Sequence, residues 1–233
     1  MANLQHMPEL VFPVDKLKEI GSLWDASKSE LPKVQGTTLG DLIDLTVGNA
    51  LATMLGGIPV VRPKMNSLLP LQADCVEVGP TRVIGGIRPQ NFDVAYRPDG
   101  VRFAYDSKTL NTKDSVGKNY QNMINDLGAE ATTVHARFAS GIIGFIVAVP
   151  FPCLGNHGKN LIAALTRLSG RDSTSGDLYK AEALGLLVWH PETGELDMNW
   201  PPNDSSLRIE KFSQQVEKAY TYRFAGQPPH NTE

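Results

Sequence analysis

The sequence has few cysteines, no long apolar run and no signal for export. Its 233 residues include two cysteines, Cys75 and Cys153, too few for a disulfide framework, which favours a reducing compartment. The longest apolar run, residues 142–152, is about half as long as a membrane helix of roughly 20 residues. The first residues lack the basic and apolar regions of a signal peptide. We therefore expect a cytoplasmic protein that does not enter a membrane.

The sequence also has no excess of basic residues over acidic ones. The 22 lysines and arginines stand against 25 aspartates and glutamates, a formal charge of −3. Any contact with nucleic acid must therefore come from local clustering of basic residues. The 41% hydrophobic content excludes a disordered chain, and 21 glycines and 16 prolines are too few for a fibrous one.

The pattern along the chain indicates one α/β domain with short additions at both ends. We expect an arm that packs on the body over residues 1–36, the domain over residues 37–225, and a frayed tail over residues 226–233. Helical spacing of apolar residues predicts helices over 37–55, 116–137, 161–168 and 213–222. Strands are expected over 75–78, 82–84, 141–149 and 184–189, with a hairpin over 92–110.

The hairpin is the most informative segment, because its register decides which side chains share a face. Pro98, Asp99 and Gly100 suit a type I turn. Pairing Tyr96 with Val101 gives one face that is entirely apolar. Since side chains alternate along a strand, the other face is then fixed.

That other face carries a cluster of charged residues. Asp93 is expected opposite Ala104, with Asp106 one diagonal step away, roughly 7–8 Å apart. Lys108 follows two residues further along, and Arg102 lies on the same face nearer the turn.

Two aspartates and a lysine on one face predict a metal-dependent hydrolytic site. Paired carboxylates repel each other, so ionisation of both Asp93 and Asp106 favours a bound divalent cation. Mg²⁺ prefers one or two carboxylates with waters and substrate phosphate, Mn²⁺ is expected to substitute, and the Ser107 carbonyl is a further candidate ligand. Lys108 would orient or deprotonate the attacking water and offset developing negative charge. These groups suffice for phosphodiester hydrolysis.

Asp93, a turn, and then Asp106-x-Lys108 on the next strand resemble the core of the PD-(D/E)xK nuclease superfamily, which includes many type II restriction endonucleases. The resemblance covers residues 38–168 and implies a central mixed sheet flanked by helices in the order αβββαβ. It implies metal-dependent cleavage of double-stranded DNA by a homodimer, with Asp93 and Asp106 as metal ligands and Lys108 as catalytic lysine. Phe92 stands where the motif has proline. The Pro98-Asp99 pair lies in the turn, too close to Asp106 to supply the first carboxylate.

Many members of this superfamily use a further acid on the first helix. Asp41 and Asp44 are the candidates there, and Glu77 on an upstream strand is a rival. Asp41 is more simply a first-turn acid that the helix dipole favours. We take Asp44 as the additional metal ligand.

Contacts with DNA are expected from basic and amide side chains around the hairpin. The segment from Arg62 to Lys118 has nine basic residues against six acidic ones. Lysine binds phosphate, and asparagine reads adenine or binds phosphate. The candidates are Arg102, Lys113, Lys118, Asn119, Asn122 and Asn125. An ordinary solvated helix face is the alternative reading of the last five.

Two other functions are compatible with the same residues. One is a DNA-binding module on the same fold without hydrolysis. The other is an unrelated α/β enzyme for a small molecule, in which Asp93 and Asp106 serve as acid and base. It would need an enclosed pocket rather than an open groove.

Overall fold

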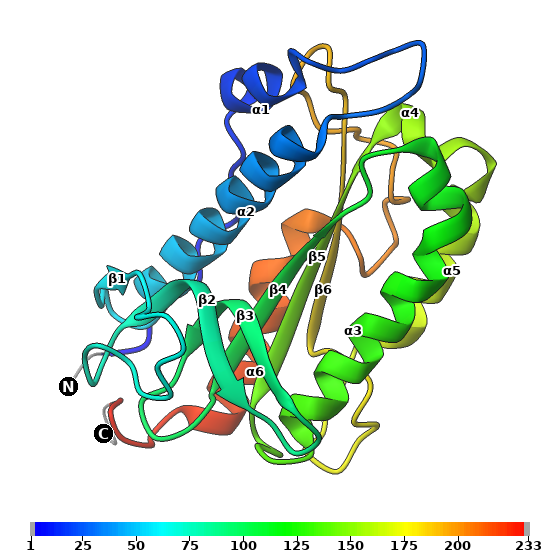
Figure 1. Ribbon diagram of the computed structural model, residues 1–233. Helices are drawn as coiled ribbons and strands as arrows, with labels where there is room; N and C mark the ends of the chain where they lie inside the picture. Colours follow the sequence, from blue (N-terminus) through cyan, green and yellow to red (C-terminus); the bar gives the residue numbers. More distant parts are fainter. Residues whose placement is uncertain (1–2, 231–233) are drawn as a thin grey trace.

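The computed structural model describes residues 3–230, without the side chains of residues 118 and 119, as helices packed on one six-stranded mixed sheet (Figure 1). The strands lie in sequence order across the sheet. They are β1 (Val60–Val61), β2 (Val76–Ile84), β3 (Pro89–Tyr96), β4 (Phe103–Thr109), β5 (Ile142–Pro150) and β6 (Ala183–Trp189). β2 is antiparallel to β3, and β3 is antiparallel to β4. β1 runs parallel to β2. β4, β5 and β6 run parallel to one another. The expected α/β class with a mixed sheet is confirmed.

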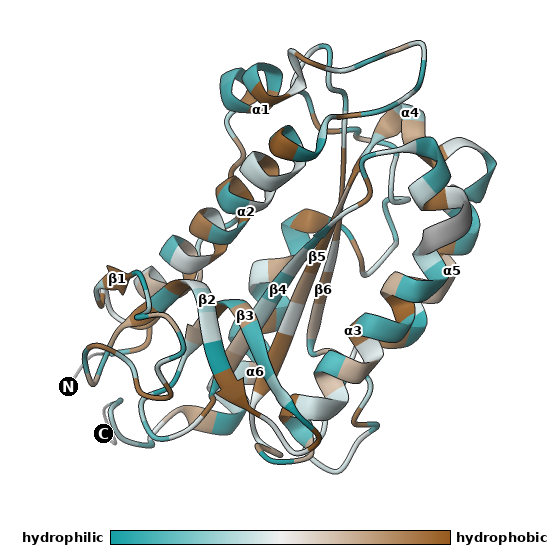
Figure 2. Ribbon diagram, in the orientation of Figure 1, coloured by the Kyte–Doolittle hydropathy of each residue, from teal (hydrophilic) through white to brown (hydrophobic). Residues whose placement is uncertain are grey.

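Helices cover both faces of the sheet and enclose two apolar cores. One core contains residues of α1 (Val14–Gly21), α2 (Lys33–Met54) and α6 (Phe212–Phe224). The other contains residues of α3 (Tyr120–His135) and α5 (Gly158–Leu168). Shorter elements are the π-helical turn η1 (Ser115–Asn119), α4 (Phe151–Leu154), η2 (Gly155–His157) and η3 (Ile209–Lys211). In Figure 2 hydrophobic and hydrophilic residues alternate along α3 and α5, as expected for helices with one buried side.

β5 and β6 form the buried centre of this arrangement. Every residue of both strands is buried. Their continuous apolar sequence is typical of parallel strands covered on both faces. β5 and β6 therefore provide a rigid base for β4, which pairs with β5 along its whole length.

α2 lies unusually close to the sheet because small residues recur along its inner side. Gly36, Gly40, Asp44 and Gly48 follow one another at four-residue intervals, which places them on the same side of the helix. A Cβ atom on Gly48 would lie 2.3 Å from Val78 Cγ2, so the sheet leaves no room for a larger residue there. The same spacing directs Asp44 toward the strands.

The expected hairpin forms, but in another register. Tyr96 pairs with Phe103 and not with Val101, a shift of two residues. The connection is longer than a four-residue turn, and within it Asp99 accepts hydrogen bonds from Arg102, which lies outside β4. The shift keeps Val94, Tyr96, Phe103 and Tyr105 in one apolar core, but Phe92, expected on the same face, packs in the other core with Ala104.

The structure of β2 differs from the sequence-based expectation. The two short strands expected over 75–78 and 82–84 are one strand, interrupted by a bulge between Val78 and Thr81. Gly79 and Pro80 lie opposite the single residue Asp93 of β3, so the bulge adds one residue to β2. Gly79 has a φ of 123°, which favours glycine.

Both ends of the described chain pack on the body. Met7, Leu10 and Phe12 are buried in the same core as α2 and α6. His230 is buried and lies 2.7 Å from the Tyr220 hydroxyl, so the expectation of a frayed tail is wrong for residues 226–230. Residues 231–233 of that tail lie outside the described part. None of the helices in residues 3–230 combines the length and hydropathy that a bilayer span requires.

Candidate active site

Asp93 and β4 meet where strands β3 and β4 separate. The ladder between the strands ends at the pair Val94 and Tyr105. One further step in this register would bring Asp93 level with Asp106. There the Asp93 carboxylate accepts a hydrogen bond from the Ser107 backbone N–H at 3.0 Å, and its other close contact is the Ser107 hydroxyl at 3.3 Å. The side chain of Asp93 therefore fills the gap between the strands.

Lys108 and Asp106 face α3 from alternate positions of β4. The Lys108 ammonium forms an ion pair with Asp106 and a second with Glu130 of α3, at 3.0 Å. Burial lowers the pKa of Lys108, but the two neighbouring carboxylates outweigh burial and raise the pKa above its usual value. Lys108 is therefore a cation at neutral pH.

Burial and the neighbouring Asp93 raise the pKa of Asp106 to about 10, although Lys108 acts in the opposite direction. The surroundings of Asp106 thus disfavour a second negative charge beside Asp93, and the Lys108 ammonium offsets that repulsion in part. A divalent cation between Asp93 and Asp106 would offset the repulsion further.

Asp44 brings a third carboxyl group to this place from α2. The residue is 8% exposed, and its Oδ1 atom has no hydrogen-bond partner in the described part of the chain. Burial and the nearby Asp93 raise the pKa of Asp44 to about 8. The structure thus brings Asp44 beside Asp93. The rival Glu77 is fully buried and bound to Arg97 at 2.7 and 2.9 Å, so it lies in a separate ion pair.

A pocket of about 300 Å³ opens Asp44 and Asp93 to solvent, whereas Asp106 and Lys108 do not line it. It lies between α2, Asp93 and the end of β4, and exposed Asp41 stands at its rim. α2 passes beside Ser107 at Gly40, where a Cβ atom would be in ordinary contact with the Ser107 hydroxyl at 3.5 Å. The residues that line the pocket are Lys33, Gly36, Thr37, Gly40, Asp41, Asp44, Asp93, Ser107, Thr109 and Asn111.

Arg102 was expected to contact DNA, but the structure buries its side chain. Its side chain is 3% exposed, pairs with Asp99 and lies over the Phe224 ring at 4.7 Å. The register shift removes Arg102 from the charged face of β4 and buries it at the end of the hairpin. Arg102 therefore holds the loop and the C-terminal segment together and is not available to DNA.

The other expected contacts lie on the segment that follows the hairpin. Lys113 is exposed, and Asn122 and Asn125 are exposed on α3. The side chains of Lys118 and Asn119 in η1 lie outside the described part. The exposed asparagines belong to the same helix as Glu130, which instead points inward to Lys108.

Glu130 is the residue of this site that the sequence analysis missed. It is 4% exposed and occupies the buried stripe of α3, three residues after Leu127 and four before Val134. An acidic residue at an apolar position of an amphipathic helix was the signal available in the sequence. Such a residue needs a buried partner, which here is Lys108.

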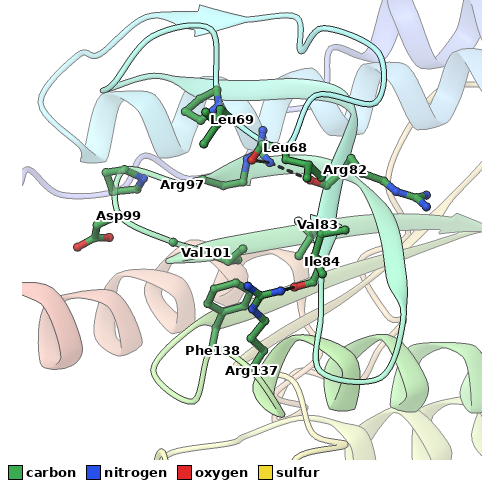
Figure 3. A pocket seen from close by; sticks show the side chains of 13 residues that line it. Leu68, Leu69, Arg82, Val83, Ile84, Arg97, Asp99, Val101, Arg137 and Phe138 are labelled. Atoms are coloured by element: carbon green, nitrogen blue, oxygen red, sulfur yellow. Dashed lines mark hydrogen bonds between the residues drawn. The ribbon is translucent and has the colours of Figure 1, made fainter.

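A second pocket, of about 320 Å³, lies at the turn of the hairpin, between the loop that carries Leu68 and Leu69 and the end of α3 (Figure 3). Its polar groups are already engaged. Arg97 binds Glu77 and also donates to the carbonyl oxygens of Leu68 and Arg82. We therefore place the candidate active site at the acidic pocket beside α2.

Within residues 3–230, no group of three or more His, Cys, Asp or Glu side chains is arranged to hold a metal ion. No family model matches the chain, and the comparisons with curated proteins and with solved structures give no match either.

Proposed function

We propose that the protein is a metal-dependent endonuclease that hydrolyses DNA phosphodiester bonds and has a restriction-endonuclease-like core. The observation that carries the proposal is the convergence of Asp93, Asp106 and Lys108 at one opening of the sheet, with Asp44 beside them. Apart from the two-residue strand β1 between α2 and β2 and the turn η1 before α3, the order α2, β2, β3, β4, α3, β5 agrees with the αβββαβ order of the PD-(D/E)xK superfamily. The pocket beside α2 admits solvent to Asp44 and Asp93, whereas Asp106 and Lys108 lie on the α3 side of β4.

The oxygen donors suit a hard divalent cation such as Mg²⁺ or Mn²⁺ by their chemistry, although in residues 3–230 they do not form a ready-made group of three ligands. Asp93 and Asp106 would hold the cation, with Asp44 and the Ser107 carbonyl as further candidate ligands and waters in the remaining positions. The unpaired, buried Oδ1 atom of Asp44 and the repulsion between Asp93 and Asp106 are the signs that a positive charge would be favourable here. When bound, the cation polarises a phosphoryl oxygen and lowers the pKa of a water ligand.

Lys108 takes the role of a fixed positive charge in this proposal. Its raised pKa excludes the neutral amine at neutral pH, so it orients the attacking water and stabilises the phosphorane-like charge instead of removing a proton. Glu130 is a positioning residue, because it holds the ammonium when Asp106 turns toward the cation.

Cleavage of mixed-sequence duplex DNA, with Mg²⁺ and with EDTA, tests the proposal. We expect Mg²⁺-dependent cutting that falls by ~100-fold or more in Asp93→Asn, Asp106→Asn and Lys108→Met. Asp15→Asn, the same change at an exposed position of α1 outside the pocket, serves as the control and should keep its activity. Cutting by the three variants at the wild-type rate contradicts the proposal. DNA binding without cutting by the wild-type protein would favour the non-catalytic module.

A further inference from the structure

The outer face of the β2–β3 hairpin carries a pair of polar side chains next to the candidate active site. Arg82 and Asn91 are cross-strand partners, and the Arg82 guanidinium donates to the Asn91 side-chain oxygen at 3.3 Å. Asn91 precedes Asp93 by two residues, so both side chains lie on the same face, about 7 Å apart along the strand. This separation equals about two base-pair steps of duplex DNA.

The inner face of the hairpin is anchored on α3, which fixes the direction of the outer face. The Gly86 N–H donates to the Thr133 carbonyl at 2.8 Å, and a Cβ atom on Gly85 would lie 2.2 Å from Thr133 Cγ2. Arg137 donates to the carbonyl oxygen of Ile84 at 3.0 Å, the contact drawn in Figure 3. A ligand of the outer face thus meets a preorganised surface and does not have to order a loop.

The charge of the outer face is positive and uncompensated. Arg82 and exposed Arg88 form no ion pair with any residue in 3–230. Exposed Arg62 lies beside the bulge, with its Cγ atom 3.7 Å from the position of a Cβ on Gly79. Arginines without acidic partners beside a cluster of acids indicate a polyanionic ligand that spans both.

The Asn91 amide and the Arg82 guanidinium indicate that this polyanion is duplex DNA. A two-stranded ribbon fits the major groove of B-DNA, where arginine binds guanine O6 and N7 and asparagine binds adenine N6 and N7. Pairing of β3 with β4 ends at Val94, next to the bulge opposite Asp93, and bulges are frequent beside active sites. The face can therefore enter the groove while Asp93 stays at the backbone.

We propose that Arg82 and Asn91 read base edges in the major groove of duplex DNA, within about two base pairs of the phosphate that the enzyme attacks. This inference rests on the proposed nuclease function. It makes the β2–β3 hairpin, and not the helix after β4, the main source of sequence preference.

The test is the base composition around cut sites in a random-sequence duplex library. Wild-type protein should show a preference at one or two positions near the cut, and Asn91→Ala and Arg82→Ala should each lose the preference at one position. Cutting of the preferred site should fall ~5- to 150-fold in these variants. Arg167→Ala, which removes an exposed arginine from α5, is the matched control and should change neither property.

The outcomes separate this inference from the proposed function. If the wild-type protein cuts no DNA, or cuts only RNA, the proposed function fails and the inference with it. If the wild-type protein cuts DNA without base preference, only the inference fails. The same conclusion follows if both variants keep the preference, or if their cutting falls equally at all sequences, as expected for phosphate contacts.

Discussion

At neutral pH and without a divalent cation, we expect the Asp44→Asn variant to be more stable than the wild-type protein. Burial and Asp93 raise the pKa of Asp44 from 3.8 to about 8 in the folded state. Below pH 4 the carboxyl group is protonated in both states and has no effect. Between pH 4 and pH 8 the unfolded chain ionises and the folded protein does not, so the wild-type stability falls by about 1.4 kcal/mol per pH unit.

The difference between the two proteins should therefore grow with pH. At pH 7 its upper limit is about 4 kcal/mol, and it should approach zero at pH 4. Urea unfolding in EDTA at four pH values between 4 and 8 measures it. Asn49→Ala is the control on the same helix, because it changes an exposed side chain that does not titrate, and its stability curve should run parallel to that of the wild-type protein. A constant difference between Asp44→Asn and wild type at every pH would refute the reasoning.

Addition of Mg²⁺ extends the same experiment. A cation that binds the folded state alone stabilises it by mass action. Millimolar Mg²⁺ should raise the stability of the wild-type protein more than that of Asp44→Asn, and the gap at pH 7 should narrow. An equal effect on both proteins would place the cation away from Asp44.

Two further changes test the environment of the site. Glu130→Gln should lower the pKa of Lys108, because one of its two carboxylate partners is lost, and the alkaline limb of the cleavage pH profile should move to lower pH; an unmoved limb would show that Glu130 does not act on Lys108. Gly48→Ala should lower the free energy of unfolding by about 1–3 kcal/mol, since its methyl group would meet Val78 at 2.3 Å. Gly128→Ala on α3 is its control in urea unfolding, because the nearest side chain is 3.8 Å away and alanine there should stabilise by up to ~1 kcal/mol. Equal effects of the two alanines would contradict the close approach of α2.

The faces of β4 were predictable from the sequence, whereas the register of the hairpin and the core that Phe92 enters were not. Alternation alone separates Asp106 and Lys108 from Phe103 and Tyr105, and any shift by two residues preserves that separation. The register depends on Asp99 and Arg102, which close a longer loop. Such a contact depends on the conformation of the loop, which composition and spacing do not determine.

Only the part of the site that lies on β4 was predictable from the sequence. Asp106 and Lys108 are two residues apart, so local geometry places both on one face. Asp44 and Glu130 come from helices on opposite sides of the sheet, and their positions depend on how those helices pack. The glycines of α2 and the acidic residue in the buried stripe of α3 carried that information, but only the tertiary contacts show what each one meets.

The central claim is that Asp93 and Asp106 share one divalent cation at the point where β3 and β4 separate. Anomalous diffraction from crystals soaked in Mn²⁺ tests it most directly. We predict a single strong peak within coordination distance of both carboxylates, with Asp106 turned away from Lys108 and Lys108 still paired with Glu130. An anomalous map without a peak between the two aspartates, while Asp106 remains bound to Lys108, would contradict the account.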